Sequence, residues 1–323
     1  VYDSKWRVFT RWCDTKHVDP CKASPQLVAD FLLFLHLEKN LSHETLVGYR
    51  AALGHVLRLT NDLDLGNNQD ISRLMANLAR DTQVSRPKIP DWNLAFVLHT
   101  LREKPFEPML QAPLKFVTLK TAFLIMLASG RRRSEIHSLA FKSVLWGPNG
   151  SKVVLKPSLD FVSKTDLANH PRSAFQSITI PALSEITDDI SELALCPVRA
   201  LRIYLNRTAP FRKDKKQLFI SMKKGFIGDI HKNTISSWIK NTVLIAYKLG
   251  SKDAESMHCI KSHHLRSLSS SWAFTRNCAL EDILSSCGWK NHSTFTSYYL
   301  RDLTLEASDL LHLGPLVVAQ SRS

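Results

Sequence analysis

The sequence predicts a mainly α-helical protein of two domains, the second of which carries a small antiparallel sheet. Apolar residues recur at helical spacing along most of the 323-residue chain. Two prolines interrupt this spacing in VSRPKIPD, at residues 84–91, and short strand-like runs gather between residues 144 and 180. Because 44% of the residues are hydrophobic, the chain can bury substantial cores. The predicted boundaries are 1–83 for a helical domain, 84–91 for a linker and 92–323 for the second domain.

Capping signals place the helices of the first domain. Ser24 and Pro25 form an N-cap followed by a first-turn proline, which predicts a helix over LVADFLLFLHLEK. Ser42 is expected to cap the next helix, and Asp70 is expected to cap a fourth, ISRLMANLARD. These signals indicate a small bundle with no catalytic residues of its own.

One helix of this bundle has a polar face that suits a DNA groove. His43, Thr45 and Arg50 place basic and hydroxyl groups on that face, opposite its apolar residues. A face that is merely solvated has the same pattern in sequence. These three residues are therefore candidates for DNA contacts, and the alternative stays open.

The second domain is predicted to mix helices with short strands. WNLAFVLHTLRE and LKFVTLKTAFLIMLASG read as helices, the latter ending at Gly130, and RRRSEIHSLAF reads as a short helix. KVVLKP, LDFVSK and FQSITIPA read as the strands of an antiparallel sheet, with Lys164 near a turn. The helix VRALRIYLNRT and the strand QLFIS follow, and Thr234 is expected to cap ISSWIKNTVLIAYKLG.

The charge of the chain points to a polyanionic partner. A net charge of +14 favours nucleic acid, the commonest such partner. No apolar run reaches the roughly 20 residues that a membrane span requires. The six cysteines form no C-x-x-C pair, which is typical of reduced thiols in a cytosolic or nuclear protein. A zinc site at His258, Cys259, His263 and His264 is disfavoured, because no second ligand cluster accompanies it.

A group of residues suited to phosphoryl transfer lies between residues 263 and 302. Breaking a phosphodiester without a metal requires fixed donors for the charged oxygens, a nucleophile and a general acid. Arginine is the best such donor, because its planar fork binds two oxygens and keeps its proton. No Walker loop, H-E-x-x-H motif or evident acidic metal cluster is present, which disfavours a metal-dependent nuclease. Neither a cofactor nor a metal is expected. The candidates are Arg132 and Arg266 as the clamp, His263 as a donor or proton-transfer group, Lys164 as the acid and a tyrosine of the pair Tyr298 and Tyr299 as the nucleophile.

These motifs, in this order, resemble those of the tyrosine recombinase (phage-integrase-type) superfamily. LASGRRRSEIHSL is similar to that family's Gly-x-Arg-x-x-Glu box, in which Arg132 takes the catalytic place. The resemblance gives Glu135 the role of supporting the arginines. It leaves Arg131 and Arg133 as contacts to DNA phosphates or solvent.

Three further motifs continue the resemblance. SHHLRS is similar to the family's His-x-x-Arg box at His263 and Arg266. Trp289, after a glycine, matches the position whose ring nitrogen donates to the scissile phosphate, and Lys164 matches the family's mobile hairpin lysine.

The resemblance extends over essentially the whole chain and looks closest to the eukaryotic retrotransposon branch of DIRS and Ngaro type. It implies a helical, SAM-like core-binding domain and an α/β catalytic domain that close around double-stranded DNA. The reaction implied is cleavage to a 3′-phosphotyrosine and strand exchange through a Holliday junction, in a homotetramer on paired sites. It also implies a nuclear location in a eukaryotic host.

The nucleophile can be assigned in two ways. Counting from Trp289 by the prokaryotic pattern gives Tyr298, whereas Tyr-Leu-Arg-Asp aligned with the retrotransposon branch gives Tyr299. Neighbours in a helix point about 100° apart, so only one can reach the phosphate. Tyr299 lies four residues after Phe295, on one helical face, and is the favoured choice. The apolar tail at 310–319 suits docking on a neighbouring protomer and packing on its own domain equally well.

Two other functions share these features. A domesticated, non-catalytic DNA-binding protein would keep the fold and the charge but has no need of the full set of reactive residues. A type IB topoisomerase would use similar chemistry to relax supercoils. The two-domain layout and the spacing from His-x-x-Arg to Gly-Trp favour the recombinase.

Overall fold

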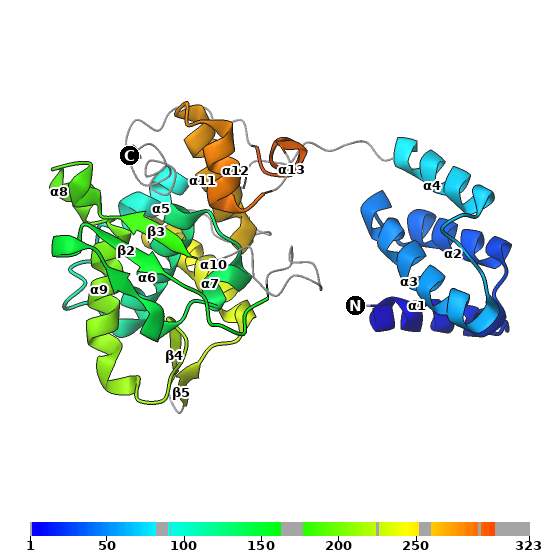
Figure 1. Ribbon diagram of the computed structural model, residues 1–323, viewed down its shortest axis with the longest axis horizontal. Coiled ribbons are helices and arrows are strands. Elements are labelled where there is room, and N and C mark those ends of the chain that lie inside the picture. The colour runs from blue at the N-terminus through cyan, green and yellow to red at the C-terminus, as the bar shows by residue number, and fades with distance from the viewer. Residues whose placement is uncertain are drawn as a thin grey trace. The chain divides into compact units, whose positions relative to one another are not determined.

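The chain forms two compact units, Val1–Ser85 and Arg86–Ser323. The division falls inside residues 84–91, the predicted linker. Helices dominate both units, and short antiparallel strands occur in the second (Figure 1). The computed structural model describes residues 2–81, 90, 92–162, 177–223, 226–251, 260–289 and 292–300, without the side chains of residues 81, 294, 297 and 298.

The N-terminal unit is a helical bundle with an aromatic core. Phe9 and Phe31 are fully buried, and their ring centroids lie 5.0 Å apart. The Ser24 side chain accepts a hydrogen bond from the Leu27 amide at 3.2 Å, so the predicted cap is confirmed. The elements are α1 (Tyr2–Thr15), the 3-10 helix η1 (Pro20–Lys22), α2 (Pro25–Leu37), α3 (His43–Asn61) and α4 (Gln69–Asp81).

The predicted N-cap of α3 is confirmed, but that of α4 is not. Ser42 is the N-cap of α3, as expected, with its hydroxyl 3.2 Å from that of Thr45. The prediction that Asp70 caps α4 was wrong. The cap is Asn68, whose Oδ1 accepts from the Ile71 amide at 3.0 Å. Asp70 lies inside the first turn, where a negative charge still favours the helix N-terminus.

The C-terminal unit is built around one buried helix, α6. Nearly all of its side chains are buried, and it packs against α9, α10 and α11. A helix that is apolar all round belongs in the middle of a domain, as Figure 1 shows for α6. The elements are α5 (Leu94–Thr100), α6 (Leu114–Ser129), α7 (Arg133–His137), η2 (Phe141–Ser143), β1 (Leu145–Trp146), η3 (Pro148–Gly150), β2 (Lys152–Leu155), β3 (Ile178–Pro181), η4 (Leu183–Glu185), α8 (Ile190–Leu193), α9 (Pro197–Thr208), η5 (Ala209–Phe211), β4 (Ile220–Lys223), β5 (Phe226–Asp229), α10 (Lys232–Leu249), α11 (Ser262–Thr275), α12 (Leu280–Cys287) and α13 (His292–Tyr298).

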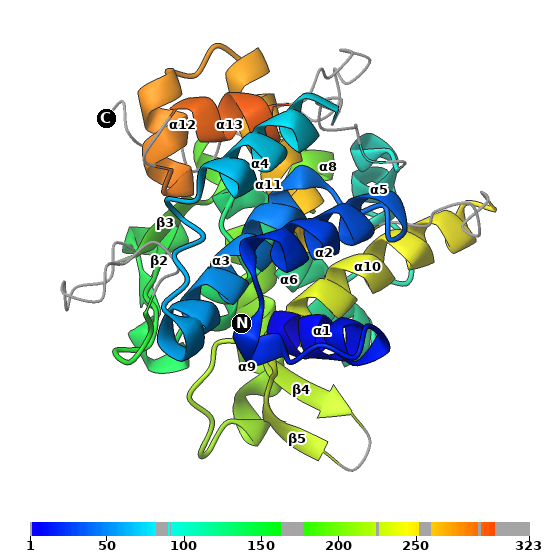
Figure 2. The same ribbon diagram turned by 90° about the vertical axis from the view of Figure 1, so that its right-hand side faces the viewer.

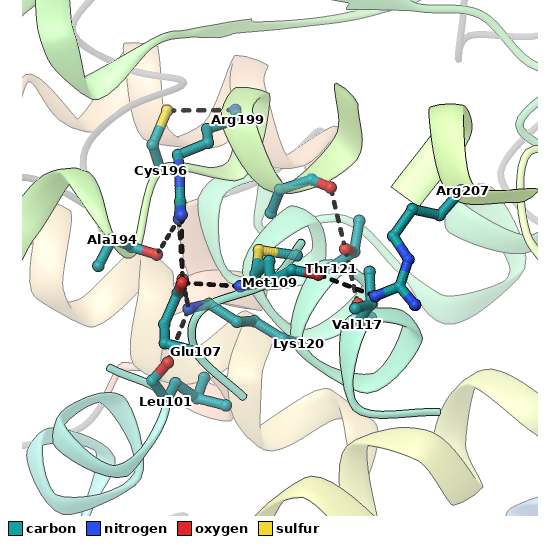
Figure 3. Close-up of polar contacts among 11 residues, drawn as sticks. Leu101, Glu107, Met109, Val117, Lys120, Thr121, Ala194, Cys196, Arg199 and Arg207 are labelled. Atoms are coloured by element: carbon teal, nitrogen blue, oxygen red, sulfur yellow. Dashed lines mark hydrogen bonds and ion pairs between the residues drawn. The ribbon is translucent and has the colours of Figure 1, made fainter. Parts of the chain in front are cut away.

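A charged network fixes the start of α6 against α9. Lys120 is fully buried in α6 and donates to the Leu101 carbonyl at 2.7 Å and to a Glu107 carboxylate oxygen. Arg199 of α9 donates to both carboxylate oxygens of Glu107, at 2.8 and 3.1 Å (Figure 3). Burial raises the pKa of Glu107, but the hydrogen bonds from Arg199 and Lys120 outweigh it and hold that pKa below its ordinary value. The buried lysine is thus retained because it is paired.

The predicted sheet is present but shorter than expected. Strands β1, β2 and β3 form one antiparallel sheet in that order, and β4 pairs with β5 in a separate hairpin. The prediction that LDFVSK forms a strand was wrong for residues 159–162. Leu159 and Val162 are exposed, and the Phe161 amide donates to the Ser158 carbonyl at 3.1 Å, which closes a turn. The rest of that run, including Lys164, lies outside the described residues.

Helix α10 begins earlier than predicted, because its cap is His231 and not Thr234. The His231 ring nitrogen Nδ1 accepts from the Asn233 amide at 3.3 Å. In this unit α12 and α13 lie together at one end, and the β4–β5 hairpin lies at the other (Figure 2). The candidate site is at the end that holds α12 and α13.

Candidate active site

Arg266 is held by the C-terminal ends of two helices. It belongs to α11 and is 1% exposed. Its Nη1 donates to the Gly130 carbonyl at 2.9 Å and its Nη2 to the Cys287 carbonyl at 2.7 Å. Gly130 is the C-cap of α6, and Cys287 is the last residue of α12. Carbonyls at a helix C-terminus carry partial negative charge, so both ends orient and stabilise the guanidinium.

Left-handed glycines make this arrangement possible. Gly130 and Gly288, the C-caps of α6 and α12, have φ of 58° and 66°, a conformation that other residues rarely adopt. A Cβ on Gly130 would lie 2.9 Å from the Cys287 sulfur. Glycine at position 130 therefore lets the ends of α6 and α12 approach each other around Arg266.

Arg132 is positioned by Glu135, the residue to which the family resemblance gives a supporting role. It is the N-cap of α7, and Glu135 lies three residues later in that helix. Oε2 of Glu135 accepts from the Arg132 amide, and Oε1 accepts from Arg132 Nη1, both at 3.0 Å. The Glu135 side chain is 3% exposed and that of Arg132 is 24% exposed. The Glu135 carboxylate thus fixes the Arg132 guanidinium, and part of that guanidinium stays exposed to solvent.

Three arginines and one carboxylate form a cluster whose charges do not balance. Arg131, Arg132 and Arg266 interact electrostatically with one carboxylate, that of Glu135, so three positive charges against one negative leave +2. Burial lowers the pKa of Arg266 and of Arg131, although arginine stays protonated at neutral pH. Burying unbalanced cations is costly unless an anion joins them. Within the described residues, the cluster is therefore suited to bind an anion.

Two aromatic rings cover the Arg266 guanidinium. Its Cζ lies 4.2 Å from the centre of the Trp289 ring and 5.3 Å from that of Tyr299. The centroids of these two rings are 4.7 Å apart. Trp289 Nε1 and Arg266 Nε are buried and have no hydrogen-bond partner among the described residues. Two buried donors without a hydrogen-bond partner among the described residues thus lie next to a charged cluster.

Tyr299 lies just beyond α13, which ends at Tyr298. Its amide donates to the Phe295 carbonyl at 2.9 Å, and its carbonyl accepts from the Ser271 hydroxyl at 3.1 Å. The sequence argument treated both tyrosines as helical neighbours, but Tyr299 is in the turn that follows the helix. The structure brings Tyr299 to Arg266 and Trp289, whereas the Tyr298 side chain lies outside the description.

The remaining predicted catalytic groups are placed only in part. His263 is exposed in the first turn of α11, three residues before Arg266. Its ring centroid is 5.1 Å from that of His264, whose Nδ1 accepts from Trp92 Nε1 at 3.4 Å. Lys164 lies outside the described residues. So do His258 and Cys259 of the disfavoured zinc site, and no cluster of potential metal ligands occurs among the residues that are described.

The predicted DNA contacts outside this cluster have different surroundings. Arg133 is exposed, and its Nη1 donates to the Ser236 hydroxyl at 3.1 Å. Thr45 is exposed and His43 half-buried at the start of α3. Arg50 instead donates to the carbonyls of Leu65 and Gly66 and to a serine hydroxyl, so it fixes the loop before α4. Its predicted contact with DNA stays a prediction that these inward bonds do not favour.

Sequence reasoning missed the two carbonyls that hold Arg266. Gly130 was expected to end a helix, but nothing in the pattern indicated that its carbonyl would meet an arginine 136 residues later. Cys287 was noted only as one of the scattered thiols. The signal was the glycine after each helix, because a left-handed C-cap exposes the last carbonyls to an outside donor.

Comparison with solved structures gives the fold. The chain is similar to the site-specific recombinase XerH bound to its difH substrate, with a TM-score of 0.53, 11% identity, and 88% of this chain and 70% of that chain covered. It is also similar to a lambda integrase dimer bound to a core site (TM-score 0.51, 14% identity, 94% and 91% covered). A third match is the Tn1549 transposon integrase with transposon right end DNA (TM-score 0.51, 15% identity, 86% and 81% covered).

The architecture is therefore that of the tyrosine recombinases and integrases, which confirms the predicted fold class. At these identities the likeness concerns the fold, and the chemistry rests on the residues of this chain. No model of a protein family matches the sequence, and no curated protein matches it either. No helix in the described part of the chain is long and apolar enough to cross a membrane.

Proposed function

We propose that this protein is a site-specific DNA recombinase or integrase that breaks and rejoins strands through a tyrosine. One observation carries the proposal: the cluster of Arg131, Arg132, Arg266 and Glu135 has a net charge of +2, and its Arg266 guanidinium lies over the ring of Tyr299. Attack of a phenolate on a phosphodiester gathers two negative charges in the transition state. A fixed charge of equal size and opposite sign stabilises that state more than the singly charged substrate.

The proposed reaction exchanges one phosphate ester for another. The Tyr299 oxygen attacks the scissile phosphorus and forms a P–O bond, while the bond to the 5′ oxygen breaks. The leaving 5′ oxygen takes a proton, for which Lys164 is the proposed acid, and His263 is the proposed acceptor of the phenol proton. A 3′-phosphotyrosine remains, and a 5′ hydroxyl attacks it in the reverse sense. Because the ester bond is conserved, the reaction as proposed needs no ATP and no metal.

The burial of Arg266 implies that the Tyr299 turn moves before Arg266 binds a phosphate. Its guanidinium is 1% exposed beneath Trp289 and Tyr299, so a phosphate can reach it only after the Tyr299 turn has moved. Trp289 Nε1 is then a donor for a non-bridging oxygen, as the family resemblance implies. Arg132, with its partly exposed guanidinium, is the first arginine that incoming DNA would meet.

The wider assignment rests on the family resemblance and on the solved structures of the same fold. Solved structures of this fold include complexes with recombination-site DNA, which supports double-stranded DNA as the partner. We extend the proposal to a homotetramer on paired sites that exchanges strands through a Holliday junction. We also propose a mobile element of the DIRS and Ngaro type as the source of the chain, and action in the nucleus of a eukaryotic host.

A covalent trap tests the proposal. The full chain is incubated with a library of nicked duplexes whose flanking sequence is randomised, so that the broken end cannot be resealed. The expected result is a covalent protein–DNA adduct that Arg266→Ala and Tyr299→Phe abolish. Arg276→Ala is the matched control, because it removes the same charge at the C-cap of the same helix and should leave the adduct intact.

The alternatives give other outcomes. DNA binding without any adduct would support a non-catalytic, domesticated DNA-binding protein. Relaxation of supercoils without preference for a site would support a type IB topoisomerase. Either result would overturn the recombinase assignment.

A further inference from the structure

Arg132 is predicted to be catalytic, but the residue before it, Arg131, occupies an unexpected place. Arg131 lies between Gly130, the C-cap of α6, and Arg132, the N-cap of α7. A Cβ built on Gly288 would lie 2.9 Å from Arg131 Nη1 and 4.0 Å from its Cζ. The guanidinium therefore packs directly on the backbone of the turn that follows α12.

Arg131 is half-buried, and its Nε atom is fully buried. Burial lowers the pKa of Arg131, while the charge of Glu135 raises it. The neighbouring Cys287 thiol is fully enclosed, and burial raises its pKa. Arg133, by contrast, is exposed and bonds to a serine on α10. Adjacent arginines thus have separate surroundings, and the sequence alone could not divide their roles.

Arg131 packs against the turn at Gly288, and this turn positions the side chain of Trp289. Gly288 has φ of 66°, and Trp289 follows it directly, with its ring stacked on Arg266. A shift of the Gly288 backbone would move the Trp289 ring nitrogen by a comparable distance. Displacements of about 1 Å at such a donor cost roughly 100-fold in rate.

We propose that Arg131 is a positioning residue that supports the Gly288–Trp289 turn instead of contacting DNA. The proposal rests on the proposed recombinase function for its kinetic consequence. Its geometric part, the contact between Arg131 and Gly288, is independent of that function.

The kinetic test separates affinity from rate. For Arg131→Ala the single-turnover cleavage rate should fall roughly 10- to 100-fold, as for residues that orient a reacting group, with the dissociation constant for DNA and its salt dependence unchanged. Arg131→Lys should recover part of the rate, because it keeps the charge but not the planar fork. Arg133→Ala is the contrast and should lower affinity and reduce the slope of log K against log salt by about one.

The geometric test needs no activity. Gly288→Ala should destabilise the wild-type chain more than it destabilises Arg131→Ala, because removing the guanidinium leaves room for the new methyl group. Urea denaturation of the wild type, Arg131→Ala, Gly288→Ala and the double variant measures the free energy of coupling between the two positions. If Gly288→Ala destabilises the wild type and Arg131→Ala equally, Arg131 does not contact Gly288, and the geometric part of the proposal is wrong.

The remaining outcomes are distinct. A weaker affinity and a smaller salt slope for Arg131→Ala, with an unchanged cleavage rate, would make Arg131 a DNA contact and overturn the proposal. An unchanged rate, affinity and slope would overturn it as well. If the wild-type chain forms no adduct, the proposed function fails, and the coupling between positions 131 and 288 still decides the geometric part. If Arg131→Ala does not fold, Arg131→Met provides the same comparison.

Discussion

Replacing Glu135 by glutamine tests whether this carboxylate holds the arginine cluster together. The substitution keeps the size of the side chain but removes the negative charge that, among the described residues, the three arginines share. Glu135 accepts two hydrogen bonds, from the amide and from Nη1 of Arg132, each at 3.0 Å. A glutamine has one oxygen, so one of these donors would face an NH₂ group and lose its partner.

The size of the effect follows from burial. Leaving a charged partner without its hydrogen bond costs about 1.5–3 kcal/mol, and breaking a fully buried pair costs about 3–5 kcal/mol. The Glu135 side chain is 3% exposed, but that of Arg132 is 24% exposed, so water compensates part of the loss. We expect Glu135→Gln to lower the free energy of unfolding by about 1.5–3 kcal/mol.

Urea denaturation of the full chain, followed by circular dichroism, measures this change. The two units can unfold separately, and the loss should be confined to the transition of the C-terminal unit. Glu281→Gln is the matched control, because that carboxylate is exposed on α12, and its removal should change stability by less than about 0.5 kcal/mol. A Glu135→Gln variant as stable as the control would refute the role of Glu135.

Three further predictions concern the network around α6, the aromatic cover and the DNA. Burial lowers the pKa of Lys120 to about 8 from an ordinary 10.5, so the unfolded chain holds this proton more tightly. The unfolding free energy of the wild type should therefore rise as the pH increases from about 8 to 10.5, and Lys120 should add no pH dependence below about 8, where both states hold the proton. The urea midpoint of Lys120→Met should lack that rise, and a parallel pH profile would contradict the argument. Trp289→Phe keeps a ring on Arg266 but loses the N–H donor, so single-turnover cleavage should slow by roughly 10²–10³-fold with little change in stability. DNA affinity, measured by fluorescence anisotropy, should fall by roughly 10³-fold between about 50 and 200 mM salt, and a flat response would count against an electrostatic clamp.

The helices and the order of the site motifs could be predicted because they depend on local patterns. The Ser24 cap and the end of α6 at Gly130 both lie within four residues of their partners. Local spacing fixes such contacts whatever the rest of the chain does.

The features that were missed depend on distant segments. Arg50 looked like a surface cation, but a loop 15 residues away turns its donors inward. The run from Leu159 has the composition of a strand, yet its described part belongs to neither sheet and forms a turn. Cys287 and Gly130 reach Arg266 only through the packing of α6, α11 and α12. Tertiary contacts of this kind leave little trace in local sequence.

Mapping the covalent adduct by mass spectrometry tests the central claim most directly. The adduct trapped on the nicked DNA library is digested with protease and nuclease, and the nucleotide-bearing peptide is fragmented to separate Tyr298 from Tyr299. We predict a single phosphotyrosine linkage at Tyr299, the ring that lies beside Arg266 and Trp289. A linkage at Tyr298 would contradict the assignment of the nucleophile, and the absence of any linkage would contradict strand cleavage by this protein.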